Sequence, residues 1–296
     1  MLDRPEEVAC CCFSGIMFAM PASQEPGWNS FARVNASQRW RQPSATMGRH
    51  MTETIVSHAR VEPGMRVLDV ASGTGEPAIS IATLLGPTGA VVATDISPEP
   101  LKIGAQRARE RGLSNIEFRP ADVHQLPFSD ASFDRVTCRL GVMFFADPPR
   151  AFAEICRVLK PGGRATLLAW GPMQQPYFEV TLGTILRLLP DAKLPASGVA
   201  MFKFAPPGTL SAALRKAGFP QVEEDSLDVP WNWPGTPQEL WEYFQEVTVP
   251  FKSLIQAIPP ERRDEVHSRV VAEIQRYYDG RKVNFTATIA LASATK

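Results

Sequence analysis

The sequence predicts an α/β fold, a doubly wound and mostly parallel sheet of seven strands with helices on both faces. Three observations lead to this prediction. From residue 66 onward, short β-rich runs alternate with helical stretches, which is the order that builds a parallel sheet. A glycine-rich turn follows the first run, and a helix begins directly after it. With 296 residues, of which 44% are hydrophobic, the chain can bury the core that such a sheet needs.

The first five strands are expected at 66–71, 90–96, 116–121, 133–139 and 164–170. Helices begin near Pro77, Pro98 and Pro148, because proline suits a first helical turn, where its missing N–H has no partner to lose. The run Lys-Pro-Gly-Gly at 160–163 ends the helix that begins at Pro148 and turns the chain into the fifth strand. Glycine supplies a left-handed stop there, and proline prevents the helix from continuing.

After Trp170 the alternation stops. Residues 171–208 contain six prolines and no clean period, which indicates a lid or an insertion. The remaining predicted elements are a helix over 209–218, a strand over 222–229, helical stretches over 238–249 and 260–278 within an insertion of 236–280, and a closing strand over 282–292.

The chain is expected to divide into a disordered extension (1–25), N-terminal helices (26–60) and the sheet domain (61–296). Two helices are predicted over roughly 28–60, packed against the sheet domain. An apolar run at 8–20 resembles the core of a signal peptide, but the residues before it are mostly acidic, the wrong charge for one. The run is also too short to cross a bilayer, so no stable membrane insertion is expected.

The charge and cysteine content exclude several classes of partner. Lys plus Arg and Asp plus Glu are both 31, so no basic excess exists to attract a nucleic acid. Five cysteines, three of them consecutive at 10–12, form neither a disulfide framework nor a zinc-ligand spacing. We therefore expect a cytoplasmic protein with no metal and no nucleic-acid partner. A homodimer is compatible with this composition.

The central feature is the sequence Val-Leu-Asp-Val-Ala-Ser-Gly-Thr-Gly-Glu-Pro at 67–77, in which an apolar strand runs into a glycine turn. Glycine allows backbone dihedrals and a close ligand approach that a Cβ would block. The carboxyl end of the first strand is where open α/β sheets bind nucleotides. The sequence therefore predicts a nucleotide-containing ligand at this turn.

Two ligands compete for the turn. Residues 73–78 satisfy the dinucleotide pattern G-x-G-x-x-A, and Asp95 follows about where its ribose-binding acid belongs. Asp69 argues against NAD, because a carboxylate within the strand could bind a cationic amino-acid ligand. Glu76 also opposes a pyrophosphate, which needs unopposed N–H donors at the helix N-terminus. A sulfonium nucleoside has no phosphate, so S-adenosylmethionine is favoured.

Five segments then occur in an order that resembles the class I S-adenosylmethionine-dependent methyltransferases, at 69–75, 92–97, 120–128, 133–134 and 157–164. Together they are similar to the branch of ubiquinone/menaquinone-biosynthesis C-methyltransferases over about residues 60–170. The segments at 170–172 and 249–251 look like a bacterial subgroup of that branch. The resemblance implies a Rossmann-like methyltransferase fold, with S-adenosylmethionine as methyl donor and S-adenosylhomocysteine as product.

The resemblance also implies which residues bind the donor: Asp69, Ala71, Ser72, Gly73, Gly75, Asp95, Ile96, Asp122, Val123, Arg139 and Leu140. The strand acid and the glycine loop would hold the methionine end. Asp95 would take both ribose hydroxyls, and Ile96 would pack on the adenine face. Asp122 would accept from the adenine amino group beside the Val123 backbone N–H. Arg139 and Leu140 would face donor and substrate.

No catalytic base is predicted. In-line methyl transfer depends mainly on proximity and alignment, and a base is needed only for a nucleophile with a high-pKa proton. Two histidines are candidates. His124 follows the adenine-binding acid and should lie at the rim of the pocket, and His50 lies in the N-terminal helices that should cover the donor. A surface or capping role is the alternative for both.

The acceptor is expected to be a small molecule. Asp147-Pro148-Pro149 lacks the following aromatic residue with which amino-methylating nucleic-acid enzymes stack a flipped base. All six tryptophans fall outside the first four strands and their helices, and the lid segment adds Tyr177, Phe178, Met201, Phe202 and Phe204. Either these side chains line a cavity for an aromatic or lipophilic acceptor such as a quinol, or they pack the core. An NAD(P)-dependent oxidoreductase and a non-catalytic S-adenosylmethionine-binding protein are the alternative functions.

Overall fold

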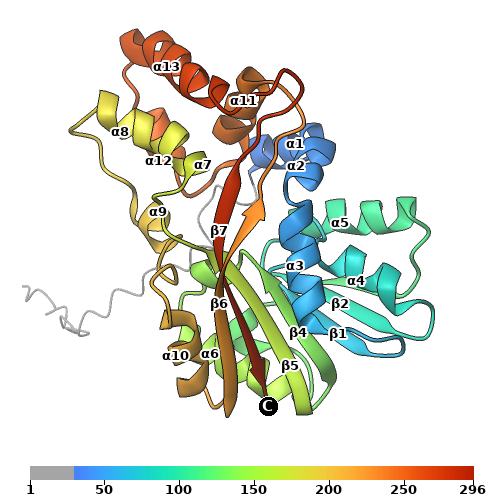
Figure 1. Cartoon of the computed structure of the whole chain (residues 1–296). Coiled ribbons are helices and arrows are strands. Elements are labelled where there is room, and N and C mark those ends of the chain that lie inside the picture. The colour runs from blue at the N-terminus through green and yellow to red at the C-terminus, as the bar shows by residue number, and fades with distance from the viewer. Residues whose placement is uncertain (1–29) are drawn as a thin grey trace, which may run out of the picture.

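The structure, a computed structural model, describes residues 30–296; the expected extension at 1–25 lies outside them, as do the three consecutive cysteines and Trp28. Seven strands form one sheet in the order β3-β2-β1-β4-β5-β7-β6 (Figure 1). They are β1 (Arg66–Val70), β2 (Ala90–Asp95), β3 (Ile116–Pro120), β4 (Phe133–Arg139), β5 (Leu159–Trp170), β6 (Gln221–Pro230) and β7 (Thr286–Thr295). Strands β1 to β5 are parallel, and β7 runs antiparallel between β5 and β6. The predicted doubly wound, mostly parallel α/β fold is confirmed.

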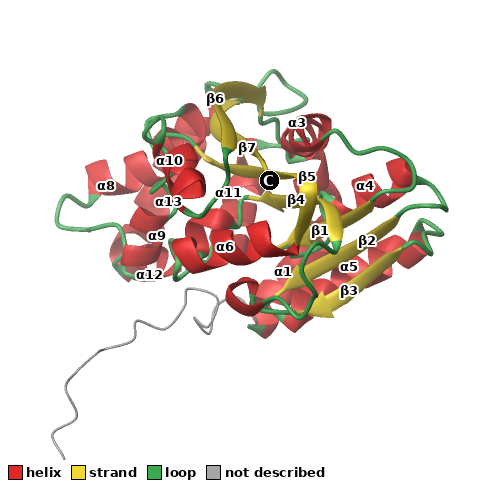
Figure 2. Ribbon diagram, turned by 90° about the horizontal axis from the view of Figure 1, so that it is seen from below, coloured by secondary structure: helices red, strands yellow, loops and turns green. Residues whose placement is uncertain are grey.

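Helices cover both faces of the sheet, which explains the apolar central strands. Helices α3 (Arg49–Ala59), α4 (Ala78–Leu85) and α5 (Pro98–Glu110) lie together on one face, and α6 (Pro148–Val158) and α10 (Thr209–Lys216) pack on the other (Figure 2). In β1, Leu68 lies opposite Val92 and Val136 of the neighbouring strands and is fully buried. The predicted helix starts at Pro98 and Pro148 are confirmed.

The N-terminal segment forms three helices, so the prediction of two is wrong. They are α1 (Phe31–Arg39), α2 (Arg41–Met47) and α3. The chain leaves helical geometry at Trp40, whose ring packs against Tyr243 and Trp233 of a distant segment. A second break falls at Gly48, where a Cβ would come within 2.8 Å of the Arg139 guanidinium. Both breaks arise from tertiary contacts.

A helical layer covers the carboxyl ends of the strands, at the top of Figure 1. It contains α7 (Pro176–Phe178), η4 (Glu179–Gly183), α8 (Thr184–Leu188), α9 (Ala196–Ala200), α11 (Pro237–Val247), α12 (Lys252–Gln256), η5 (Pro260–Arg262) and α13 (Arg263–Gln275). Aromatic rings hold this layer together: Phe178 lies 5.0 Å from Phe202, and Phe244 lies 6.2 Å from Phe251. No helix within residues 30–296 is long and apolar enough to cross a membrane.

Two strands begin four or more residues from the predicted position. β5 begins at Leu159, five residues early, because Leu159 pairs with Phe133 before a bulge interrupts the ladder. β7 begins at Thr286, four residues late, because Val283 instead makes isolated bridges to Trp233 and Tyr278.

Candidate functional site

A cavity of about 380 Å³ opens at the carboxyl ends of β1, β2, β3 and β4, within the size range of small-molecule sites. Loops after these strands form its floor. Helices α1, α2, α3, α5 and α11 supply the rest of its wall, together with the loop after β6. Of the donor residues expected from sequence, those that line the cavity are Ala71, Ser72, Gly73, Asp95, Ile96, Asp122, Val123, Arg139 and Leu140.

The glycine loop between β1 and α4 forms the centre of this floor. Gly73 has φ +53°, and no atom lies within 4 Å of the position that a Cβ would take. Gly75 has φ +103°, and a Cβ there would collide with Ile79 at 2.7 Å and with Gly104 of α5 at 3.2 Å. The first glycine thus leaves room for a ligand, whereas the second lets the loop pack closely on its helices. Gly75 itself does not line the cavity.

Asp69 lies beneath the loop and not on the cavity surface. It is fully buried, and Thr137 of β4 donates to its Oδ1 at 2.7 Å. Its Oδ2 and the nearby Ser72 hydroxyl have no hydrogen-bond partner within the described part of the chain. Because the carboxyl is removed from water, its pKa rises from 3.8 to about 7. The cavity reaches this region through Ser72.

Asp95 ends β2 and ties two loops together. Its Oδ2 accepts from the Gly73 backbone N–H at 2.9 Å, and its Oδ1 accepts from the Ser97 N–H at 2.8 Å. Burial raises its pKa, and the Arg33 guanidinium on α1 opposes that rise. A carboxylate has about four acceptor sites, so two remain for a ligand in the cavity.

His124 holds Asp122 and has no free nitrogen. Its Nδ1 donates to Asp122 Oδ1 at 2.6 Å, and its Nε2 accepts from the Asp147 backbone N–H at 3.1 Å. The backbone donor requires an unprotonated Nε2, so the ring is the neutral Nδ1–H tautomer. His124 lines the cavity rim as expected, yet both of its nitrogens are engaged. His124 is therefore placed to orient Asp122 and not to act as a base.

His50 is not brought to the cavity. Its imidazole lies 3.0 Å from Glu53, one turn along α3, and it is absent from the cavity lining.

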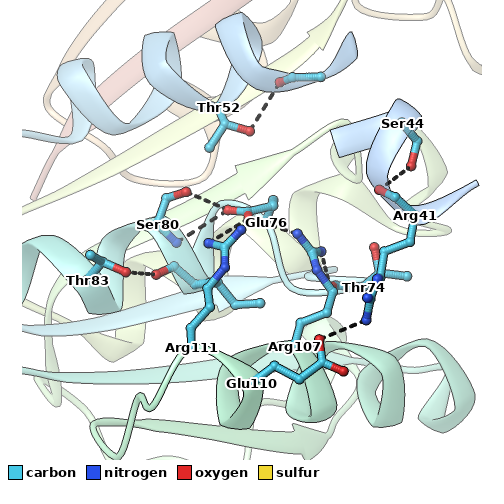
Figure 3. A network of polar contacts seen from close by, with 12 residues as sticks. Arg41, Ser44, Thr52, Thr74, Glu76, Ser80, Thr83, Arg107, Glu110 and Arg111 are labelled. Carbon is cyan, nitrogen blue, oxygen red and sulfur yellow. Dashed lines mark hydrogen bonds and ion pairs between the residues drawn. The ribbon is translucent and has the colours of Figure 1, made fainter. Parts of the chain in front are cut away.

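An ion-pair network fixes the glycine loop from the side of α5 (Figure 3). Arg107 Nη2 lies 3.0 Å from Glu76 Oε1, and both side chains are at most 12% exposed. Arg107 Nη1 also donates to the Thr74 carbonyl at 2.5 Å. Ser80 donates to the other Glu76 oxygen at 2.7 Å, and Arg111 lies 3.7 Å from the first. The loop is therefore held in place before any ligand binds.

Arg139, at the end of β4, reaches over this loop. Its Nε and Nη1 donate to the carbonyls of Glu76 and Gly48, each at 3.3 Å. No carboxylate oxygen in the described part of the chain comes within 4.0 Å of its guanidinium, although it is enclosed by protein. Burial lowers its pKa, but an arginine stays charged at neutral pH. The cavity thus holds a cation that lacks a direct acidic partner.

Several cavity residues were not identified from the sequence: Arg33, Ser37, Arg41, Ser44, Ala45, Gly48, Thr52, Tyr243 and Val247. They come from α1, α2, α3 and α11, which carry no recognisable motif. Trp231 is the one tryptophan within residues 30–296 that lines the cavity. The large apolar side chains of this predicted lid or insertion do not line it, so the core-packing alternative holds for Tyr177, Phe178, Met201, Phe202 and Phe204.

Comparison with known proteins gives one family. The model of the ubiE/COQ5 methyltransferase family matches residues 44–229. The ubiquinone/menaquinone biosynthesis C-methyltransferase UbiE of Pseudomonas putida strain GB-1 is 43% identical over 126 residues, which is 42% of this chain and 49% of that protein. The chain therefore spans about half the length of the curated relatives it matches.

Solved structures share the fold at low sequence identity. A SAM-dependent methyltransferase from Aquifex aeolicus has a TM-score of 0.52 and 19% identity, covering 66% of this chain and 92% of that chain. The phosphoethanolamine N-methyltransferase 2 of Haemonchus contortus, in complex with S-adenosyl-L-methionine, has a TM-score of 0.52 and 16% identity. It covers 90% of this chain and 60% of that chain. At these sequence identities, the similarity shows a shared fold.

Proposed function

Because this chain belongs to the ubiE/COQ5 methyltransferase family, we propose that it is an enzyme that transfers a methyl group from S-adenosylmethionine to a small-molecule acceptor. The acceptor proposed is an aromatic or lipophilic molecule such as a quinol. The observation that carries the proposal is the convergence of Asp95, Asp122 and the glycine loop on one cavity at the carboxyl ends of the parallel strands.

The residues present fit the nucleoside part of the donor. Asp95 retains acceptor sites for the two ribose hydroxyls after binding its backbone donors. His124 uses only Oδ1 of Asp122, so Oδ2 would accept from the adenine amino group. Ile96 supplies an apolar surface for the adenine ring.

The methionine end would lie over the glycine loop. The space beside Gly73 accommodates it, and the Ser72 hydroxyl, which lines the cavity, provides an acceptor on the side of its ammonium group. Asp69 is buried beneath the loop beside Ser72 and would act on the ammonium group through it. Arg139 would bind the carboxylate, which would supply the anion that this guanidinium otherwise lacks.

The mechanism then needs alignment more than acid–base chemistry. When bound, S-adenosylmethionine supplies an electrophilic methyl group with a thioether leaving group. The loop clamped by Arg107 and the Asp95 hydrogen bonds hold the donor side rigid, while α1, α2 and α11 enclose the acceptor side. Fixing both partners in line can supply most of the rate.

A dinucleotide fits this cavity less well. Glu76 lines it close to the helix that follows the glycine loop, where a pyrophosphate would have to bind. Its carboxylate is already held by Arg107 and Ser80, so it is not available to move away. This argues against the NAD(P)-dependent oxidoreductase alternative.

The test of the proposal is incubation of the full chain with methyl-labelled S-adenosylmethionine and an extract of small metabolites. We expect label in a low-molecular-weight aromatic product. Binding of S-adenosylmethionine without transfer to any acceptor would support the non-catalytic alternative. Label recovered only in highly charged, non-aromatic acceptors would contradict the proposed acceptor class.

The proposal also includes a cytoplasmic location and allows a homodimer. The free thiols of Cys138 and Cys156 support a reducing compartment. Sedimentation of the purified chain measures its oligomeric state directly.

A further inference from the structure

The loop that carries Asp122 is held in place mainly by one neighbouring helix. It covers residues 122–132, between β3 and β4, and its first residues line the cavity. Within residues 30–296, every hydrogen bond that leaves this loop goes to α6 or to Asp147, the N-cap residue of α6. The position of Asp122 therefore depends on α6.

Two side chains on one face of α6 bind the backbone of this loop at separate points. Arg150 Nε donates to the His124 carbonyl at 2.8 Å. One helical turn later, Glu154 Oε2 accepts from the Leu126 N–H at 2.8 Å. Residues four apart lie on the same side of a helix, so these contacts follow the loop along the helix axis.

Arg157 extends this row and binds two carbonyls of the loop. Its Nη1 donates to the Phe128 carbonyl at 2.7 Å, and its Nη2 donates to the Leu126 carbonyl at 3.0 Å. The same guanidinium binds Glu154 through Nε and Nη2, at 2.7 and 2.8 Å. This two-point contact fixes the orientation of both side chains. Glu154 and Arg157 together hold both the N–H and the carbonyl of Leu126.

The pair of Glu154 and Arg157 is charged and partly shielded from water. The hydrogen bond from Arg157 holds the pKa of Glu154 below its ordinary value, so the carboxylate is ionised at neutral pH. The side chains are 30% and 20% exposed, which limits the screening of their attraction. Phe152 and Ile155 anchor α6 in the core, so the pair stands on a fixed support.

Neither Glu154 nor Arg157 lines the cavity, so both can act on a ligand only through the loop. At the other end of the loop, Asp122 presents its Oδ2 to the amino group of adenine. A base that carries an oxygen in place of that amino group, such as hypoxanthine, sets one acceptor against another. This repulsion rejects the wrong base only if the carboxylate cannot move away from it.

We propose that Glu154 and Arg157 are positioning residues that give the donor site its selectivity for adenine over hypoxanthine. This inference rests on the proposed function and assigns part of its donor recognition to residues outside the cavity. By holding Leu126 from behind, the pair keeps Asp122 and the Val123 N–H at a fixed place beside the edge of the base.

The test compares two ligands by calorimetry with the full chain. S-adenosylhomocysteine and S-inosylhomocysteine differ in the group that Asp122 faces, which is an amino group in the first and an oxygen in the second. We expect the wild type to bind S-adenosylhomocysteine at least about 100-fold more tightly. Arg157→Met should lower this ratio about 10-fold, because a loop that can move accommodates both bases.

The ratio separates positioning from a loss of stability. A variant that is merely less stable would lose affinity for both ligands by the same factor. Glu154→Gln is a milder second variant, because it keeps the shape of the side chain and removes its charge. It should lower the ratio about 3- to 10-fold.

Arg215→Met is the matched control. It removes an arginine from α10, which packs beside α6. Arg215 donates to the Val222 carbonyl at 2.9 Å and does not line the cavity. The ratio of the two affinities should stay as in the wild type.

Equal affinity of the wild-type protein for the two ligands overturns the inference without any variant. An unchanged ratio in folded Arg157→Met or in folded Glu154→Gln overturns it as well. A protein that binds S-adenosylhomocysteine without selecting its base leaves the proposed function standing. Absence of S-adenosylhomocysteine binding overturns both.

Discussion

The ionisation of Asp69 affects the stability of the folded state. Its pKa is about 7 in the folded protein and near the ordinary 3.8 when the chain unfolds. Because the folded state keeps the proton to higher pH, the resulting stabilisation is fully present below pH 3.8 and is lost as pH rises to about 7. Across that window the free energy of unfolding should fall by about 1.4 kcal/mol per pH unit.

Asp69→Asn should therefore abolish this part of the pH dependence. The amide mimics the protonated carboxyl, so the variant should be more stable than the wild type at about pH 8 and similar to it at about pH 4. Urea unfolding at several pH values measures both curves. Parallel curves for the two proteins would contradict burial of an ionisable carboxyl at this position.

Substitution of Arg139 should weaken the binding of ligands that carry the methionine carboxylate and not of ligands that lack it. Arg139→Gln should weaken binding of S-adenosylhomocysteine about 10- to 100-fold, because a charge-assisted contact to its carboxylate is lost. Binding of 5′-methylthioadenosine, which has no carboxylate, should change little. Both are measured by calorimetry.

Arg135→Gln is the matched control for Arg139. It removes an arginine from the same strand, but Arg135 donates to the Ala59 carbonyl and does not line the cavity. The role given to Arg139 is wrong if Arg139→Gln lowers the affinity for S-adenosylhomocysteine and for 5′-methylthioadenosine equally.

At the scale of elements, the contact between α5 and the glycine loop should be the most sensitive to substitution. Arg107→Met leaves the buried Glu76 carboxylate with the Ser80 hydroxyl and the more distant Arg111 guanidinium as partners. It also removes the hydrogen bond to the Thr74 carbonyl. We expect a loss of about 3 kcal/mol in the free energy of unfolding. The affinity for S-adenosylhomocysteine should fall too, since the loop is no longer fixed.

Arg111→Met serves as the control on the same helix. Its side chain is 49% exposed and lies 3.7 Å from Glu76, so its loss should cost less than about 1 kcal/mol. Urea unfolding of the two variants compares them directly. If both lose the same stability, the buried pair does not clamp the loop.

Elements with a local signal were predictable from sequence, and those set by distant contacts were not. Strands β1 and β2 were predictable because their apolar runs are buried on both faces. Helix α6 was predictable because Asp147 caps it and Pro148 opens it. The break at Trp40 has no comparable local signal. It depends on packing against Tyr243, about two hundred residues later in the chain.

In the candidate site, too, residues placed by the strand order were predictable, and features set by distant contacts were not. Asp95 ends β2 and Asp122 follows β3, so their position at one sheet edge follows from the parallel topology. The role of His124 could not be inferred, because its Nε2 is occupied by the backbone N–H of Asp147 from another loop. Asp69 was placed in the correct strand, but its burial beneath the loop depends on the loop's own conformation.

For the whole molecule, the cavity is closed by parts of the chain that are far apart in sequence. Arg39 of α1 pairs with Glu246 of α11 at 2.6 Å, and the Trp40 indole donates to the same carboxylate at 2.7 Å. Residues 171–208, predicted as a lid or an insertion, pack into the helical layer and do not line the cavity. Hydrophobic periodicity shows that a helix is amphipathic but not which surface it covers. The sequence therefore could not show that α1 and α11, and not residues 171–208, close the cavity.

The central claim is that the cavity at the strand ends binds S-adenosylmethionine through Asp95. Calorimetry of the full chain with S-adenosylhomocysteine and with NADH, for the wild type and for Asp95→Asn, tests it most directly. We expect the wild type to bind S-adenosylhomocysteine and not NADH, and Asp95→Asn to bind about 10- to 100-fold more weakly while remaining folded. Binding of NADH alone, or undiminished binding of S-adenosylhomocysteine by a folded Asp95→Asn variant, would contradict the account.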